Sequence, residues 1–139
     1  MSAIVAQDDV AVVRAFTDAM RAGNIDTCLE MVAPDLVFSE AESLPFGGDY
    51  HGRDGFLQLL RTVNRHLKVE LTTPEITGGD GLVAVRVHGT MTARATGRSM
   101  PMDVVDLYRL SDGTITRVDV FYKEPSAVAD LCREHEAAR

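Results

Sequence analysis

Ionisable and apolar side chains alternate closely in one stretch of this sequence, from residue 35 to residue 52. Glu40 follows the apolar run 36–38, Glu42 stands two positions later, and His51 lies beyond a glycine-bearing break. A carboxylate beside apolar groups can act as a general base, because proton transfer is most effective when the pKa of the base lies near the working pH. Glu40 is therefore our first candidate for a base, and Glu42 and His51 remain alternatives.

A second carboxyl group, that of Asp106, stands in a segment whose alternate residues share one face of a predicted strand. The other residues of its row are apolar or aromatic, namely Met100, Met102, Val104, Tyr108 and Leu110. Removal from water disfavours a charged carboxylate, so Asp106 must either hold its proton or have a partner. Tyr50, Tyr108 and Tyr122 are candidate donors of a hydrogen bond to a developing oxyanion, with aromatic core packing as the alternative.

The elements that position these residues begin with helices. Apolar residues at helical spacing predict three amphipathic helices, over residues 8–22, 25–32 and 53–67. Gly23 and Pro34 are the stop signals of the first two. The run 36–38 favours a short strand into Glu40, and the prolines and glycines that follow predict a loop.

From residue 68 onward the apolar period changes to two. Turn sequences at 78–81, 95–97 and 111–113 divide this region into four strands of a meander. Arg86 and His88 fall on the opposite face to the valines around them, so the sheet has an apolar side, which the helices should cover, and a polar side. A final helix begins at the proline that follows the last strand.

Composition narrows the classes of function. The 139-residue chain carries 21 acidic and 14 basic residues and a net charge of −7, which argues against a nucleic-acid-binding face. It has neither a basic leader with an apolar segment nor a run of about 18 apolar residues, so we expect a cytoplasmic protein without a membrane partner. Cys28 and Cys132 fall at apolar helical positions and are expected to be reduced core residues.

No motif for a bound group is visible in the sequence. The four histidines are scattered without the spacing of a metal site, and neither a phosphate-binding glycine motif nor a nucleophile elbow occurs. We therefore predict no metal site and disfavour nucleotide use and acyl-serine chemistry. Because composition does not shift along the chain, we expect a single domain over residues 1–139.

Five short motifs stand at the boundaries of the predicted elements: Ala22-Gly23-Asn24-Ile25-Asp26, Ala33-Pro34-Asp35-Leu36-Val37, Tyr50-His51-Gly52-Arg53-Asp54, Val69-Glu70-Leu71-Thr72 and Asp112-Gly113-Thr114-Ile115. With the order of elements over about residues 8–124, they resemble the nuclear transport factor 2-like superfamily, which includes ketosteroid isomerases and SnoaL-like polyketide cyclases. The resemblance implies an α+β fold, with three helices of the N-terminal half on the concave face of a cone-shaped, mostly antiparallel sheet (cystatin-like). A C-terminal helix, about 125–136, would complete one SnoaL-like domain.

The resemblance also implies roles for particular residues. Glu40 falls where isomerase-like members hold a general-base carboxylate, and Asp106 falls where they hold a neutral aspartic acid that donates to an oxyanion. Phe16, however, stands where the isomerases place an oxyanion-hole tyrosine, and Leu60 stands where a supporting tyrosine would be. These two departures disfavour steroid isomerisation itself.

The expected function is cofactor-free acid-base catalysis of the cyclase or isomerase type on an apolar, polyketide-derived carbonyl compound in a deep hydrophobic pocket. Epoxide hydrolase-type or dehydratase-type water chemistry is one alternative, and a non-catalytic ligand-binding or scaffold protein is another. The resemblance implies a homodimer through the outer sheet face. Besides the catalytic candidates Glu40, Asp106 and His51, we expect these residues to bind substrate: Phe16, Met20, Glu42, Phe46, Tyr50, Leu60, Val85, Val87, Met102, Val104, Tyr108, Val118, Val120 and Tyr122.

Overall fold

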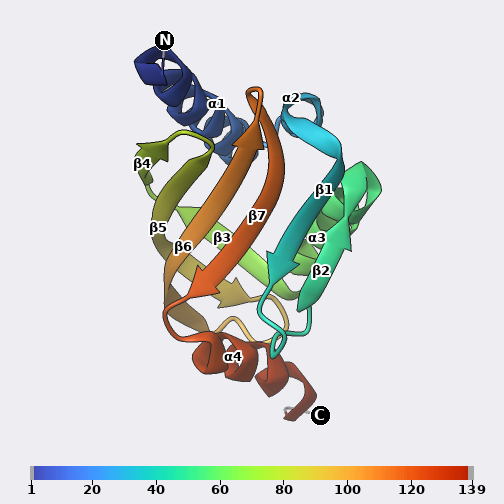
Figure 1. Ribbon diagram of the computed structural model, residues 1–139. Helices are drawn as coiled ribbons and strands as arrows, with labels where there is room; N and C mark the ends of the chain where they lie inside the picture. Colours follow the sequence, from blue (N-terminus) through green and yellow to red (C-terminus); the bar gives the residue numbers. More distant parts are fainter. Residues whose placement is uncertain (1, 138–139) are drawn as a thin grey trace.

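A strongly curved sheet forms one wall of the protein in the computed structural model, which describes the backbone of residues 2–137 and the side chains of residues 9–133 (Figure 1). The strands are β1 (Val32–Glu40), β2 (Gly48–His51), β3 (Leu67–Leu71), β4 (Glu75–Gly79), β5 (Leu82–Ala93), β6 (Ser99–Ser111) and β7 (Thr114–Tyr122). Their order is β2-β1-β7-β6-β5-β3, and β4 also pairs with β5. Only the pairing of β1 with β7 is parallel among these strands.

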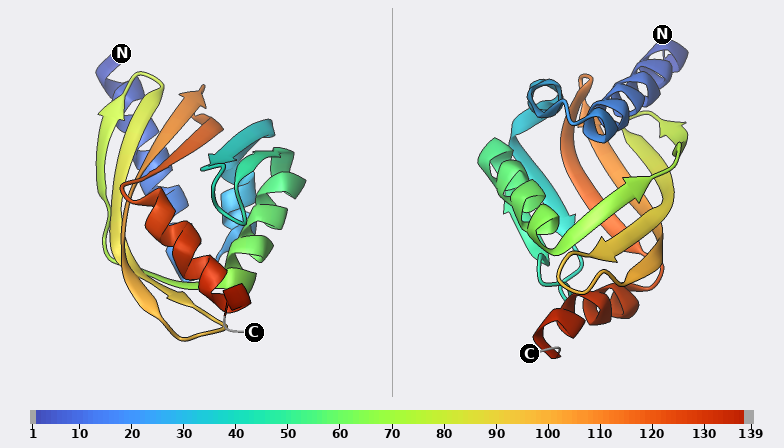
Figure 2. Two further views of the ribbon diagram at one scale, coloured as in Figure 1. Left: turned by 90° about the horizontal axis from the view of Figure 1, so that it is seen from below. Right: turned by 180° about the vertical axis from the view of Figure 1, so that it is seen from behind.

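Four helices accompany the sheet: α1 (Ser2–Ala22), α2 (Ile25–Met31), α3 (Gly52–His66) and α4 (Pro125–Ala137). The sheet curls around α1 and α3, and α4 lies across one end of it (Figure 2). None of the helices within residues 2–137 combines the length and the hydrophobicity that a membrane-spanning segment requires. The predicted α+β fold, a curved and mostly antiparallel sheet with a C-terminal helix, is confirmed.

The two faces of the sheet differ as the alternating pattern predicts. In β5, Val83, Val85 and Val87 are buried, whereas Arg86 and His88 are exposed on the other face. The buried valines belong to one continuous apolar core that also includes residues of all four helices. The helices therefore cover the valine side, and the functional candidates on that side are enclosed by α1, α3 and α4.

The first predicted strand of the meander is in fact two short strands. β3 and β4 both pair with β5, and the regular pairing is interrupted between them at residues 72–74, where buried Pro74 removes a hydrogen-bond donor. Opposite this break, Gly89 pairs with Leu71, and a Cβ on Gly89 would lie 2.0 Å from the carbonyl oxygen of Glu70. A glycine is required there because the two backbones approach so closely.

Two further elements differ from the sequence-based expectation. β1 starts at Val32 rather than at residue 36. Pro34 is tolerated inside the strand because it lies in an irregular stretch between the paired residues Val32 and Val37, where no backbone N–H is needed for pairing. β2 was expected to be loop, yet its residues pair with β1 from Val37 to Glu40. Glycine and proline break only the segment before it, and the cross-strand pairs stabilise the rest.

Arg53 joins α3 to the end of α2. Its Nε donates to the carbonyl oxygen of Leu29 and its Nη2 donates to that of Val32, both at 3.1 Å. The last carbonyls of a helix have no partners within the helix, so a side chain that binds two of them stabilises the junction.

We expect Arg53→Lys to lower the free energy of unfolding by about 1–2 kcal/mol, because one ammonium group cannot reproduce the two-pronged contact. Urea denaturation measures the change. Arg61→Lys is the matched control, since Arg61 is exposed on the same helix and has no recorded partner among the described side chains. Equal effects of the two substitutions would contradict the role assigned to Arg53.

Candidate active site

Glu40 is a buried carboxyl group at the end of β1. Its residue is only 8% exposed, and its Oε1 accepts a hydrogen bond of 2.8 Å from the hydroxyl of Tyr122, the last residue of β7. Burial raises the pKa of Glu40 to about 8; the Tyr122 hydrogen bond opposes this shift, and the nearby charge of Asp106 adds to it. Glu40 is thus held in place by one donor and has the pKa of a base suited to neutral pH.

Asp106 lies in the middle of β6 on the same concave face. Although the residue as a whole is half-buried, its Oδ1 is out of reach of solvent and has no hydrogen-bond partner among the described residues. Burial raises the pKa of Asp106 to about 7. Buried polar atoms in proteins nearly always have partners, so an unpartnered carboxyl oxygen indicates a site that a ligand can satisfy.

Strand register brings the two carboxyl groups into one row. Ser39 pairs with Asp119, so Glu40 comes next to Val120, and Val120 pairs with Asp106. Neighbouring strands lie about 4.8 Å apart, which places the Cα atoms of Glu40 and Asp106 about 10 Å from each other. Both side chains point to the concave face with Val120 between them, and at this separation the charge of Asp106 still raises the pKa of Glu40.

A small chamber of about 80 Å³ lies against Asp106. Its walls include four of the predicted substrate-binding residues, Phe16, Met20, Val87 and Tyr108, together with Phe38 of β1. A cavity needs about 10–15 Å³, measured in the same way, to hold one water molecule. The chamber therefore admits a small group of atoms rather than a whole polycyclic molecule.

Aromatic rings fix the inner wall of this Asp106 chamber. The ring of Phe16 meets that of Tyr108 edge-on, with centroids 5.8 Å apart, and lies 5.9 Å from the ring of Phe56. Phe56 in turn packs on Phe38 at 5.7 Å. Phe16 therefore serves as core, and any hydroxyl donor to a ligand must come from a residue other than Phe16.

The three candidate tyrosines separate clearly in the structure. The hydroxyl of Tyr50 donates to the carbonyl oxygen of Phe46 at 3.0 Å, and that of Tyr122 donates to Glu40. Tyr108 is buried, lines the Asp106 chamber, and has no hydrogen-bond acceptor within the part of the chain that the structure describes. Burial and the neighbouring Asp106 raise the pKa of Tyr108, so its hydroxyl keeps its proton and remains a donor.

Glu40 lines a second, more open hollow of about 310 Å³ rather than the Asp106 chamber. Tyr122 and Val120 line it, as do Pro125 at the start of α4 and the exposed Glu42. Glu40 and Glu42 both line this hollow, but only the side chain of Glu40 is buried. We call this space the Glu40 hollow.

The remaining predicted site residues lie elsewhere. His51 is exposed where β2 meets α3 and has no recorded contact with Glu40, whose partner is Tyr122. Leu60 lines a separate groove beside β3. The others form the apolar core around the site rather than its walls: Phe46, Val85, Met102, Val104 and Val118.

Several chamber residues were not among the predicted site residues. Thr17 and Arg21 line the chamber from α1, and Leu71, Thr72 and Pro74 line it from the break between β3 and β4. Thr17 and Arg21 each follow a residue of the apolar stripe of α1, Phe16 and Met20. The stripe therefore indicated which part of α1 forms this wall. The break had no such signal. Within the described side chains, no three His, Cys, Asp or Glu residues are placed to hold a metal ion.

The chain belongs to the SnoaL-like domain family, whose sequence profile matches residues 13–118. A search of curated protein sequences finds no significant match.

Solved structures share this fold at low sequence identity. An NTF2-like protein from Burkholderia xenovorans LB400 is 21% identical with a TM-score of 0.83, over 91% of this chain and 97% of that one. A predicted polyketide cyclase from Xanthomonas campestris pv. campestris is 21% identical with a TM-score of 0.78, over 90% and 97%. TerC, co-crystallised with polyporic acid, is 21% identical with a TM-score of 0.80, over 91% and 98%.

Replacing Asp106 should change how stability depends on pH. The folded-state pKa of Asp106 is raised from 3.8 to about 7, so the native protein holds a proton that the unfolded chain has lost. Stability is therefore highest below the unfolded pKa and falls as pH rises through the folded pKa. Asp106→Asn removes this fall, and we expect its Tm to exceed that of the wild type by at least about 5 °C at about pH 8.5, and by less at about pH 5.

Thermal unfolding at both pH values measures this difference. The control is Asp35→Asn, because Asp35 is exposed and should not give a pH-dependent gain. A constant difference between Asp106→Asn and wild type across this pH range would contradict the raised pKa.

Proposed function

We propose that this protein is an acid-base enzyme of the cyclase or isomerase type that acts on an apolar carbonyl compound. The observation that carries the proposal is the pair of carboxyl groups on one apolar face, Glu40 with a hydrogen-bond donor and Asp106 with an unpartnered oxygen. Such a pair supplies a base and an acid on one face of the sheet, as general acid-base catalysis of proton transfer requires.

Near neutral pH the two carboxyl groups share one proton. The raised pKa values of about 8 for Glu40 and about 7 for Asp106 lie close together, and ionisation of either group disfavours ionisation of the other. Tyr122 donates to Glu40 and stabilises its charged form, whereas Asp106 Oδ1 receives no donor. The pair therefore holds one shared proton. The two pKa values lie only about one unit apart, so the form with a charged Glu40 and a protonated Asp106 is accessible, and the proposed reaction uses this form.

This arrangement performs one step well. Glu40 removes a proton from the carbon beside the substrate carbonyl, and the electron pair of the broken C–H bond moves to the carbonyl oxygen. Protonated Asp106 donates a hydrogen bond to this developing oxyanion, and Tyr108 is placed to give a second. The enolate then either takes the proton back at another carbon, which is isomerisation, or attacks a second carbonyl carbon, which is cyclisation.

The size of the site limits how the substrate binds. The Asp106 chamber of about 80 Å³ accepts the reacting carbonyl group, and the rest of a polyketide-like molecule must extend outside it.

Proton exchange at carbon tests the function without knowledge of the natural substrate. In deuterium oxide, the protein should speed incorporation of deuterium beside the carbonyl of small cyclic ketones such as cyclopentanone and indanone. We expect Glu40→Gln to lower this rate by at least about 100-fold and Asp106→Leu by at least about tenfold, because base and oxyanion donor are removed. Mass spectrometry measures the exchange.

Glu42→Gln is the matched control, since Glu42 is exposed and two residues away. Unchanged exchange in both Glu40→Gln and Asp106→Leu would end the proposal, and loss of exchange only in Glu42→Gln would move the base to Glu42. Incorporation of oxygen from labelled water into a product would instead indicate hydration or dehydration chemistry.

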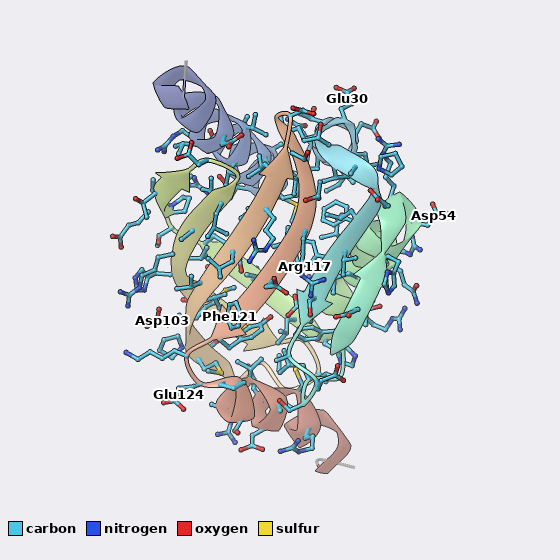
Figure 3. All side chains as sticks on the ribbon, in the orientation of Figure 1. Glu30, Asp54, Asp103, Arg117, Phe121 and Glu124 are labelled. Carbon is cyan, nitrogen blue, oxygen red and sulfur yellow. The ribbon has the colours of Figure 1, made fainter. Side chains whose placement is uncertain are left out.

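We also propose that two copies of the chain associate through the outer face of the sheet. Phe121 is 55% exposed on this face, next to the half-buried Val105 (Figure 3). Ion pairs surround it, including Arg86 with Asp103 at 3.4 Å and Arg117 with Asp119 at 3.0 Å. An apolar centre with a charged rim is typical of protein interfaces.

Phe121→Asp should convert the dimer into a monomer, because the central apolar contact is replaced by a charge that faces its own copy. Sedimentation equilibrium measures the change, with Ala95→Asp in the β5–β6 turn as the control. A wild-type protein that is monomeric at every concentration tested would contradict the dimer.

A further inference from the structure

A wide groove of about 740 Å³ runs beside β3, between the C-terminal ends of α1 and α3. Its apolar floor consists of Leu60, Leu67, Val69 and Leu71. Three basic side chains, Arg21, Lys68 and Arg94, and two acidic ones, Asp18 and Glu70, stand around this floor. The lining therefore carries a positive balance in a chain whose net charge is −7. We call this space the β3 groove.

Arg94 is the basic residue of the β3 groove whose charge is not balanced. Lys68 lies 3.3 Å from Glu70, and Arg21 lies 3.9 Å from Asp18. Arg94, in contrast, donates from Nε to the backbone carbonyl of Asn64 and from Nη2 to the Asn64 side-chain oxygen at 2.7 Å, and no carboxylate of the described residues pairs with it.

The contact with Asn64 orients the guanidinium for a further ligand. Its two bonds to Asn64 occupy one edge of the planar group, and the edge formed by Nη1 and Nη2 keeps its N–H donors. Two parallel N–H groups on one edge match the two oxygens of a carboxylate, and a side chain that is already held loses little entropy on binding. Arg94 is thus prepared for an acidic group.

The β3 groove adjoins the Asp106 chamber. Met20, Arg21 and Leu71 line both spaces and stand at their boundary, which we call the neck. Leu67, at the start of β3, pairs with Ala93, the residue before Arg94. From Leu67 to Leu71 the strand advances about 3.3 Å per residue, so about 13 Å of apolar floor separates Arg94 from the neck.

We propose that the β3 groove binds the acidic end of an elongated substrate. The carboxylate pairs with Arg94, the apolar chain lies along the floor, and the far end reaches Asp106 through the neck. This inference rests on the proposed function for the role of Asp106, and it adds the substrate class: a carbonyl compound with a carboxylate about 13 Å or more from its reacting end.

Binding of a matched pair of simple probes tests the inference. Decanoate and decanol share an apolar chain and differ in charge, and isothermal titration calorimetry measures the affinity of each. Arg94→Gln should weaken decanoate binding about tenfold, because a charge-assisted pair is lost, and should leave decanol binding unchanged. Arg61→Gln on α3, which removes an equal charge outside the groove, should change neither.

A second variant guards against a folding defect in Arg94→Gln. Lys68→Gln keeps the Arg94–Asn64 contact and should weaken decanoate binding by a smaller factor, about threefold, because Lys68 is already paired with Glu70. Decanoate binding that is absent from the wild type, unaffected by Arg94→Gln, or equally weakened by Arg61→Gln would overturn the inference.

These outcomes remain distinct from those of the proposed function, because the probes contain no reacting ketone. If the wild-type protein shows no deuterium exchange but binds decanoate in an Arg94-dependent way, the proposed chemistry is refuted and the binding role of the β3 groove stands. If exchange depends on Glu40 but decanoate binding does not depend on Arg94, the binding role of the β3 groove is refuted and the proposed chemistry stands.

Discussion

Two carboxyl groups share the apolar concave face of one sheet, and the cost of removing their charges from water governs the site. A single buried carboxylate can be stabilised by a hydrogen bond, as Tyr122 stabilises Glu40. Two adjacent charges on an apolar face are much less favourable, because each disfavours the other. In the proposed function, the consequence is a shared proton near neutral pH, and with it a base and an acid that stand in one row of side chains.

The pairing of three strands creates this row of side chains. The parallel pairing of β1 with β7 places the end of β1 beside Val120, and the antiparallel pairing of β7 with β6 places Asp106 on the other side of it. Curvature of the sheet around α1 and α3 then closes the face against solvent (Figure 2). The break between β3 and β4 contributes Leu71, Thr72 and Pro74 to the wall of the chamber beside Asp106, and Leu71 also lines the β3 groove.

Local patterns in the sequence predicted the parts of the site that depend on one strand or one helix. Asp106 was found because a period of two places it in an apolar row, and Glu40 because it ends a short strand. The Tyr122 bond to Glu40 spans 82 residues and follows from strand pairing, which no local pattern encodes. Likewise, Arg94 meets Asn64 across 30 residues, at the junction of a turn and a helix end. Only the folded chain brings these residues together.

The carboxyl carbon NMR signals of Glu40 and Asp106, followed through a pH titration, test the central claim most directly. Our account predicts that both groups titrate well above their ordinary range, toward about 8 and about 7, and that Asp106→Asn lowers the pKa of Glu40 by removing a neighbouring charge. Titration of both groups near about pH 4, with no effect of Asp106→Asn on Glu40, would contradict the shared proton.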